Sequence, residues 1–227
     1  MDCNLARYPM EQKMQLDKDE GGQLVDAKEY RSIVGSLRYL THTRLDVSYA
    51  VGVVSRFMEA PTTKHQQAVK HILRYIQGTI EYGLEYKKAG SKRAVIGFSD
   101  SDLAGDVVDR RSTGGMCFYL DGNLIYWESQ KQRVIALSSC EAEYMAATMA
   151  ACQSIWLRGL LGELTGQEVG AVILCVDNRS TIKLMKNPEQ RADILTKALG
   201  KVKFEAIQNL LGVKDIVAGD AGVKKYV

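Results

Sequence analysis

Apolar positions recur at helical spacing through the first third of the chain. Asp26 and Glu29 stand at the spacing of a capping box, and apolar residues return every three or four positions after them. The same spacing continues through 47–57 and, after a proline break, through 63–78. The pattern therefore predicts three helices. Residues 80–86 instead alternate between apolar and polar positions, which predicts a half-buried strand.

The pattern changes after a lysine-rich stretch at 87–92, where short apolar runs typical of strands replace the helical spacing. The predicted elements are strands at 95–98, 116–120 and 124–127, a long helix at about 138–163, a strand at 172–176, and helices at 182–185 and from residue 190. One apolar face of the long helix is expected to hold Met145, Met149, Cys152, Trp156 and Leu160. Ala146, Ala147 and Ala150 make its other faces small, so the helix is expected to be buried on more than one side. This order favours an α/β fold in which a mixed sheet is flanked by helices.

These changes divide the chain into four expected regions. They are a flexible arm at 1–25, a small helical module at 26–88, a mixed-sheet domain at 89–200, and a C-terminal helix and tail at 201–227. Apolar residues make up 46% of the chain, so a buried core is expected.

Composition excludes some classes of protein and leaves others open. The net charge is only +3, so any argument for nucleic-acid binding depends on local basic clusters. The five cysteines form no C-x-x-C pair, which argues against a zinc site or a disulfide framework. No apolar run approaches the roughly 18 residues of a membrane span. We therefore expect a protein of the cytoplasm or nucleus that does not bind membranes.

Candidate chemistry lies in carboxylates at the ends of predicted elements. Asp100 and Asp177 end strands, Glu143 lies early in the long helix, and Asp193 lies near the start of the last helix. Carboxylates at the ends of adjacent strands can converge and bind hard cations such as Mg²⁺. Two such ions about 4 Å apart can promote cleavage of a phosphodiester bond. A lone Asp at a strand end is more commonly a turn or cap residue, so no single one of these residues identifies a site.

The motifs around these carboxylates are more specific than the carboxylates alone. In order they are GFSDSDLAGD at 97–106, RSTGG at 111–115, LSSCEAEY at 137–144, CVDN at 175–178 and ADILTK at 192–197. Their sequence and order resemble the ribonuclease H region of the copia-type retrotransposon Pol polyproteins. The segment EYRSIVGSLRYL at 29–40 resembles the connector that precedes this region in the family. The resemblance covers about residues 26–212.

The resemblance implies a ribonuclease H-like fold and metal-dependent endonucleolytic cleavage of RNA in RNA–DNA hybrids. The implied catalytic residues and metal ligands are Asp100, Glu143, Asp177 and Asp193, which would hold two Mg²⁺ or Mn²⁺ ions. The implied partners are the hybrid and the reverse transcriptase region of a parent polyprotein. Glu141, at the third position after Ser138, is interpreted as a capping residue. Asp102 and Asp106 are expected as solvated turn residues that could support metal binding.

Several residues are candidates for contacts to nucleic acid. They are Arg110, Arg111, Ser138, Ser139, Asn178 and Lys183. Lys and Arg would contact phosphates without reading sequence, and a hybrid would be recognised by its shape and its 2′-hydroxyl groups. Trp127 and Trp156 are expected in the core rather than as stacking platforms.

The chain also departs from the family pattern. It contains no Y-x-D-D motif, so no polymerase activity is expected, and Leu45 and Leu103 stand where the family usually has Pro and Trp. About a dozen residues separate Asn178 from Asp193, where the family has a longer segment. The sheet should therefore have four strands and an open edge. The departures leave a second hypothesis, a catalytically weak or inactive relic that at most binds nucleic acid. A third, an integrase-type core, fits the LSSCEAEY motif poorly.

Overall fold

The first part of the structure is a module of three helices. The computed structural model describes residues 4–12, 14–88 and 94–185. Helices α1 (Ala27–Leu40), α2 (Ser48–Val54) and α3 (Thr63–Gly78) confirm the three predicted helices. The middle one is shorter than predicted, because the 3₁₀ turns η1 (Leu45–Val47) and η2 (Ser55–Phe57) replace its ends. Asp26 caps α1 by accepting hydrogen bonds from the backbone N–H groups of Lys28 and Glu29.

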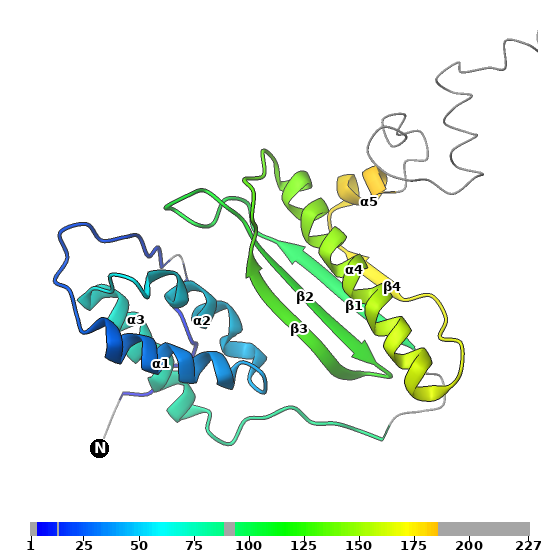
Figure 1. Cartoon of the computed structure of the whole chain (residues 1–227), viewed down its shortest axis with the longest axis horizontal. Helices are drawn as coiled ribbons and strands as arrows, with labels where there is room; N and C mark the ends of the chain where they lie inside the picture. Colours follow the sequence, from blue (N-terminus) through cyan, green and yellow to red (C-terminus); the bar gives the residue numbers. More distant parts are fainter. Residues whose placement is uncertain (1–3, 13, 89–93, 186–227) are drawn as a thin grey trace, which may run out of the picture. The chain divides into compact units, whose positions relative to one another are not determined.

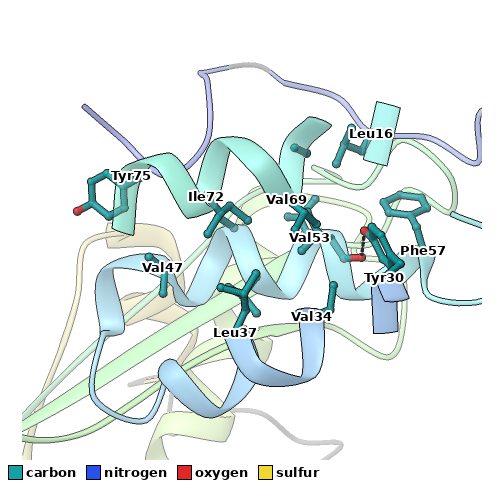
Figure 2. Packing of buried hydrophobic residues seen from close by; sticks show 14 residues of the cluster. Leu16, Tyr30, Val34, Leu37, Val47, Val53, Phe57, Val69, Ile72 and Tyr75 are labelled. Carbon is teal, nitrogen blue, oxygen red and sulfur yellow. Dashed lines mark hydrogen bonds between the residues drawn. The ribbon is translucent and has the colours of Figure 1, made fainter. Parts of the chain in front are cut away.

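The apolar faces of these helices form one hydrophobic core, which Figure 2 shows. Val34 of α1, Val54 of α2 and Ile72 of α3 are completely buried in it. The hydroxyl of Tyr30 donates a hydrogen bond of 2.9 Å to the carbonyl oxygen of Val54, so this polar group is satisfied within the core. Each such aliphatic side chain stabilises the module by roughly 1.5–3 kcal/mol.

The segments that flank the helices differ from the sequence-based expectation. Several described residues of the segment before α1, which the sequence suggests is a flexible arm, pack against the helical module, with Leu16 in its core. The strand expected at 80–86 does not form. Ile80 and Tyr82 are largely exposed, because no strand partner lies beside this segment in the described residues. Alternation alone cannot supply the hydrogen bonds that a strand requires.

The second part is a mixed sheet of four strands. They are β1 (Val95–Ser101), β2 (Thr113–Leu120), β3 (Asn123–Lys131) and β4 (Ile173–Val176), in the order β3-β2-β1-β4. The β1–β2 and β2–β3 pairs are antiparallel and the β1–β4 pair is parallel. The structure thus confirms an α/β fold with a mixed sheet and flanking helices, consistent with a ribonuclease H-like fold. In the described residues β4 is an edge strand, as the short segment before Asp193 predicts.

Helix α4 (Ser139–Thr165) packs along one face of the sheet, mainly against β1 (Figure 1). Its buried face consists of Ala142, Glu143, Ala146, Ala147, Ala150 and Leu157. The alanine side of the helix is buried as expected, but the expected burial of the face with Met149 and Trp156 was wrong, since both are more than half exposed. Small alanine side chains allow the helix backbone to approach the sheet closely, and this contact outweighs the larger apolar residues on the other face. On the sheet side Gly97 leaves room for the buried ring of Phe118.

Helix α5 (Arg179–Met185) follows β4, and residues up to Thr181 belong to one compact unit with the preceding elements. The expected helix from residue 190 and the region 201–227 lie outside the described residues. Within the described part of the chain, no helix is both long and apolar enough to span a membrane.

Candidate active site

Three of the four candidate carboxylates meet at one end of the sheet. One carboxylate oxygen from each of Asp100, Glu143 and Asp177 lies within 4.8 Å of the others. Asp100 is near the end of β1 and Asp177 directly follows β4. Because β1 and β4 are parallel neighbours, with Ser99 opposite Val176, the two aspartates lie at the same end of the sheet, where both strands end. The fourth candidate, Asp193, lies outside the described residues.

The start of α4 determines which of two neighbouring glutamates faces the sheet. Ser138 is the N-cap and accepts a hydrogen bond of 3.2 Å from the backbone N–H of Glu141. The Glu141 carboxylate accepts one of 2.7 Å from the backbone N–H of Leu137, one residue before the N-cap residue Ser138. Glu141 is therefore a capping residue. Glu143, two positions later, is 7% exposed and turns toward the two aspartates.

Glu143 lies in an environment that disfavours its negative charge. Burial, together with the charges of Asp177 and Asp100, raises its pKa to about 7. Its Oε2 atom is buried and has no hydrogen-bond partner in the described part of the chain. Asp100 and Asp177 are exposed. An all-oxygen group with one unsatisfied buried oxygen and two exposed carboxylates fits a hard divalent cation.

A cavity of about 570 Å³ lies beside these carboxylates. Asp100 and Asp177 line one part of it, and Phe98, Cys117 and Trp127 line another. Trp127 is partly buried rather than in the core, and its indole N–H donates a hydrogen bond of 2.9 Å to the carbonyl oxygen of Thr41 in the helical module. Asp100 and Asp177 are therefore accessible from a hollow that is largely apolar.

Asp106, which the sequence suggests is a solvated turn residue, is instead a buried ion-pair centre. Its carboxylate contacts the guanidinium of Arg56 at 2.8 Å and the ammonium of Lys131 at 2.7 Å. Burial alone would raise its pKa, but hydrogen bonds from Lys131 and from the backbone N–H groups of Val108 and Asp109 lower it to about 2. The expectation for Asp106 was wrong because its partners come from distant parts of the chain.

Asp102 likewise has a structural partner. Its carboxylate accepts a hydrogen bond of 2.6 Å from the backbone N–H of Thr113, which joins the loop after β1 to the start of β2. Neither Asp102 nor Asp106 belongs to the carboxylate group formed by Asp100, Glu143 and Asp177.

The candidate nucleic-acid contacts occupy varied positions. Arg110, Ser138, Ser139 and Lys183 are exposed, whereas Arg111 is partly buried and lies 3.6 Å from the carboxylate of Asp109. The side-chain oxygen of Asn178 accepts hydrogen bonds from the backbone N–H groups of Ser180 and Thr181, so it caps α5. The hydroxyl of Thr181 in turn donates to the carbonyl oxygen of Cys140, which joins α5 to the first turn of α4. Sequence patterns gave no signal for this contact.

Comparison with known proteins identifies relatives of the chain. It is 36% identical over 238 residues to the retrovirus-related Pol polyprotein from transposon RE1 of Arabidopsis thaliana, covering 90% of this chain and 16% of that protein. It is 38% identical over 218 residues to the corresponding polyprotein from transposon TNT 1-94 of Nicotiana tabacum, covering 81% of the chain and 16% of that protein. It is 50% identical over 129 residues to secreted RxLR effector protein 161 of Plasmopara viticola, covering 56% of the chain and 90% of that protein.

The match to the Pol polyproteins extends over most of this chain but only a small part of theirs. The chain spans 16% of the length of the RE1 and TNT 1-94 polyproteins. No family model and no solved structure matches the chain. The polyprotein matches nevertheless cover 81–90% of this chain, which includes most of the helical module and of the mixed sheet. The chain belongs to the family of retrovirus-related Pol polyproteins from copia-type transposons.

Proposed function

We propose that this chain is a retrotransposon-type ribonuclease H, which cleaves RNA within RNA–DNA hybrids by a metal-dependent endonucleolytic reaction. The observation that carries the proposal is the meeting of Asp100, Glu143 and Asp177 within 4.8 Å at one end of the sheet. The family membership supports it, because the motifs that contain these residues occur in the order typical of the ribonuclease H region.

In this proposal the three carboxylates hold divalent cations, with Asp193 as a further ligand. Mg²⁺ or Mn²⁺, two ions when fully loaded, would activate a water molecule and stabilise the leaving oxygen of the scissile phosphodiester. Asp100 and Asp177 are exposed and can contact an ion that also binds a phosphate, whereas Glu143 approaches from the buried side. The RNA–DNA hybrid would lie across the exposed carboxylates, with phosphate contacts from Arg110, Arg111 and Lys183 and backbone or sugar contacts from Ser138, Ser139 and Asn178.

The remaining parts of the proposal concern the context of the domain. We propose that residues 26–88 are a connector and 89–200 the nuclease domain, and that both cooperate with the reverse transcriptase region of a parent polyprotein in the cytoplasm or nucleus. The Plasmopara viticola relative carries the name of a secreted effector, but no Arg-x-Leu-Arg tetrapeptide occurs in this sequence. We therefore propose no effector role.

The test is cleavage of a labelled RNA–DNA hybrid by the full chain in Mg²⁺ or Mn²⁺. Asp100→Asn should abolish cleavage while leaving the circular dichroism spectrum unchanged, because an amide is a much weaker ligand for a hard cation than a carboxylate. Glu163→Gln is the matched control, since Glu163 is an exposed carboxylate near the far end of α4.

Two results would contradict the proposal. Cleavage that survives Asp100→Asn would move the activity to another site or to a contaminant. A folded wild-type chain that binds the hybrid but does not cleave it in either metal would favour the second hypothesis, an inactive relic that at most binds nucleic acid.

A further inference from the structure

Gln132, which directly follows β3, connects the two elements that bear Asp100 and Glu143. Its side-chain Nε2 donates a hydrogen bond of 3.1 Å to the hydroxyl of Ser101 and one of 2.9 Å to the carbonyl oxygen of Ala142. Ser101 is the neighbour of Asp100 in β1, and Ala142 is the neighbour of Glu143 in α4. One amide group therefore bridges the strand end and the helix turn from which two candidate ligands project.

The chemistry of its partners fixes the orientation of this amide. The carbonyl oxygen of Ala142 can only accept, so the nitrogen of the Gln132 side chain must face it. The Ser101 hydroxyl donates to the carbonyl oxygen of Asp102 at 3.0 Å, which leaves the hydroxyl oxygen free to accept from Gln132. Exchanging the nitrogen and oxygen of the Gln132 amide would place an acceptor against the Ala142 carbonyl.

The backbone at both ends of this bridge is also held. The backbone N–H of Gln132 donates a hydrogen bond of 2.7 Å to the carbonyl oxygen of Ser112, next to the start of β2. The backbone N–H of Ser101 donates one of 2.7 Å to the carboxylate of Asp100. Ala142 is completely buried against the sheet. The amide therefore links positions that have little freedom of their own, and a change in its length or bonding must be transmitted to them.

We propose that Gln132 is a positioning residue that sets the separation between the carboxylates of Asp100 and Glu143, a role that rests on the proposed function. A small divalent cation such as Mg²⁺ demands near-ideal geometry, with oxygen ligands at about 2.0–2.1 Å, so small displacements of one ligand weaken binding. Outer groups that orient metal ligands by hydrogen bonds commonly change metal affinity or activity by about 10–100-fold when they are removed.

The test uses Gln132→Met in the full chain, because methionine is close in size but donates no hydrogen bond. Binding of Mn²⁺ alone, measured by electron paramagnetic resonance titration without nucleic acid, should weaken about tenfold. In hybrid cleavage kcat should fall while KM for the hybrid stays unchanged, since Gln132 is not placed at the substrate. Gln130→Met is the matched control, because Gln130 is an exposed residue of β3 two positions before Gln132, and this variant should bind Mn²⁺ like the wild type.

A second variant keeps the test decisive if Gln132→Met does not fold. Ser101→Ala removes one of the two acceptors and retains the hydrogen bond to Ala142, so it should weaken Mn²⁺ binding by a smaller factor. In a folded double variant the effects of Ser101→Ala and Gln132→Met should not add, because both break the same bridge. Wild-type Mn²⁺ affinity in Gln132→Met, or in Ser101→Ala where the first variant is unfolded, would overturn the role of Gln132.

The outcomes separate this role from the proposed function. Mn²⁺ binding that Asp100→Asn abolishes and Gln132→Met weakens supports the positioning role even if the wild-type chain cleaves no hybrid, in which case only the nuclease assignment fails. A wild-type chain that binds no Mn²⁺ overturns the metal site and the role of Gln132 together.

Discussion

Glu143 is the residue at which burial and like charges act together, and this combination has an energetic cost in the metal-free protein. Its pKa is raised from 4.5 to about 7 by burial and by the charges of Asp177 and Asp100. The folded chain therefore holds this proton more tightly than the unfolded chain does. As pH rises from about 4.5 to about 7, the folded state loses stability relative to the unfolded state.

We expect Glu143→Gln to stabilise the metal-free chain at pH 8, by about 1–3 kcal/mol, because the neutral amide removes the repulsion. The measurement is urea unfolding in the presence of a chelator at pH 5 and pH 8. The variant should gain stability over the wild type only at the higher pH. Added Mg²⁺ should stabilise the wild type and have little effect on the variant.

Glu163→Gln provides the comparison for this prediction, because it makes the same substitution at an exposed position of α4. Equal effects of the two substitutions on the free energy of unfolding at pH 8 would show that the charge of Glu143 does not destabilise the folded chain.

At the residue scale, sequence reasoning found the residues with a local signature and missed those with distant partners. The strand ends and the capping box predicted where Asp100, Glu141 and Glu143 would lie. Asp106 gave no comparable signal, because its partner Arg56 is far away in sequence. Gln132 was missed for the same reason, since hydrogen bonds across elements leave no periodic pattern.

At the scale of elements, Arg56 joins the helical module to the loop that follows β1. Its guanidinium contacts the carboxylate of Asp106 at 2.8 Å and donates to the hydroxyl of Thr113 at 3.0 Å. The Asp106 side chain is only 3% exposed, so these hydrogen bonds are poorly screened by solvent. Together with the hydrogen bond from Trp127 to Thr41, they connect η2 and α1 to β2 and β3.

Arg56→Met should destabilise the chain by about 1–3 kcal/mol, because it removes charged hydrogen bonds while Lys131 still neutralises Asp106. Urea unfolding at pH 7 measures the effect. Arg38→Met, at an exposed position of α1, should change the free energy of unfolding by less than about 0.5 kcal/mol. A similar small effect for Arg56→Met would mean that the two parts are joined by other contacts.

The same ion cluster should make stability depend on pH under acidic conditions. The pKa of Asp106 is lowered from 3.8 to about 2, so the unfolded chain binds this proton more readily. The contribution of Asp106 is present above about pH 4 and is lost as pH falls toward about 2. Wild-type stability should therefore fall by roughly 2 kcal/mol more than that of Asp106→Asn over this interval. Parallel stability curves for the two proteins would contradict this assignment.

Elements were predicted well where periodicity and hydrogen-bond partners agree. The four strands and the helices α1, α3 and α4 followed from such patterns. Residues 80–86 alternate as a strand does but lack a partner, and α4 buries its alanine face instead of its methionines and Trp156. In both cases the tertiary environment decided the result, and a single sequence does not reveal that environment.

At the scale of the whole molecule, the described residues bring three carboxylates together, and Asp193 in the closing motif is the fourth ligand that we propose. A two-ion site requires ligands on both sides of the scissile phosphate. Asp100, Glu143 and Asp177 are close enough to share one ion. The short segment between Asn178 and Asp193 makes the second position the part of the proposed site that most needs a test.

Asp193→Asn should therefore affect the binding of the second ion and not that of the first. Binding of the first Mn²⁺ should keep its wild-type strength, because its ligands are unchanged, whereas the second should bind at least about tenfold more weakly, because it loses a direct carboxylate ligand. Hybrid cleavage should fall accordingly, and raising the Mn²⁺ concentration should restore part of it. Titration of the full chain by electron paramagnetic resonance, with cleavage measured at matched metal concentrations, gives both quantities.

Glu189→Gln serves as the control for this prediction, because it removes a neighbouring acidic group from the same segment of the sequence. If both substitutions leave the affinity for the second Mn²⁺ and the rate of hybrid cleavage unchanged, Asp193 is not a ligand in this chain. If the wild type binds only one Mn²⁺ and does not cleave the hybrid, the chain retains the family's sequence motifs without its complete site. A short segment before Asp193 would then be the physical reason for an inactive protein, because the fourth carboxylate could not reach the other three.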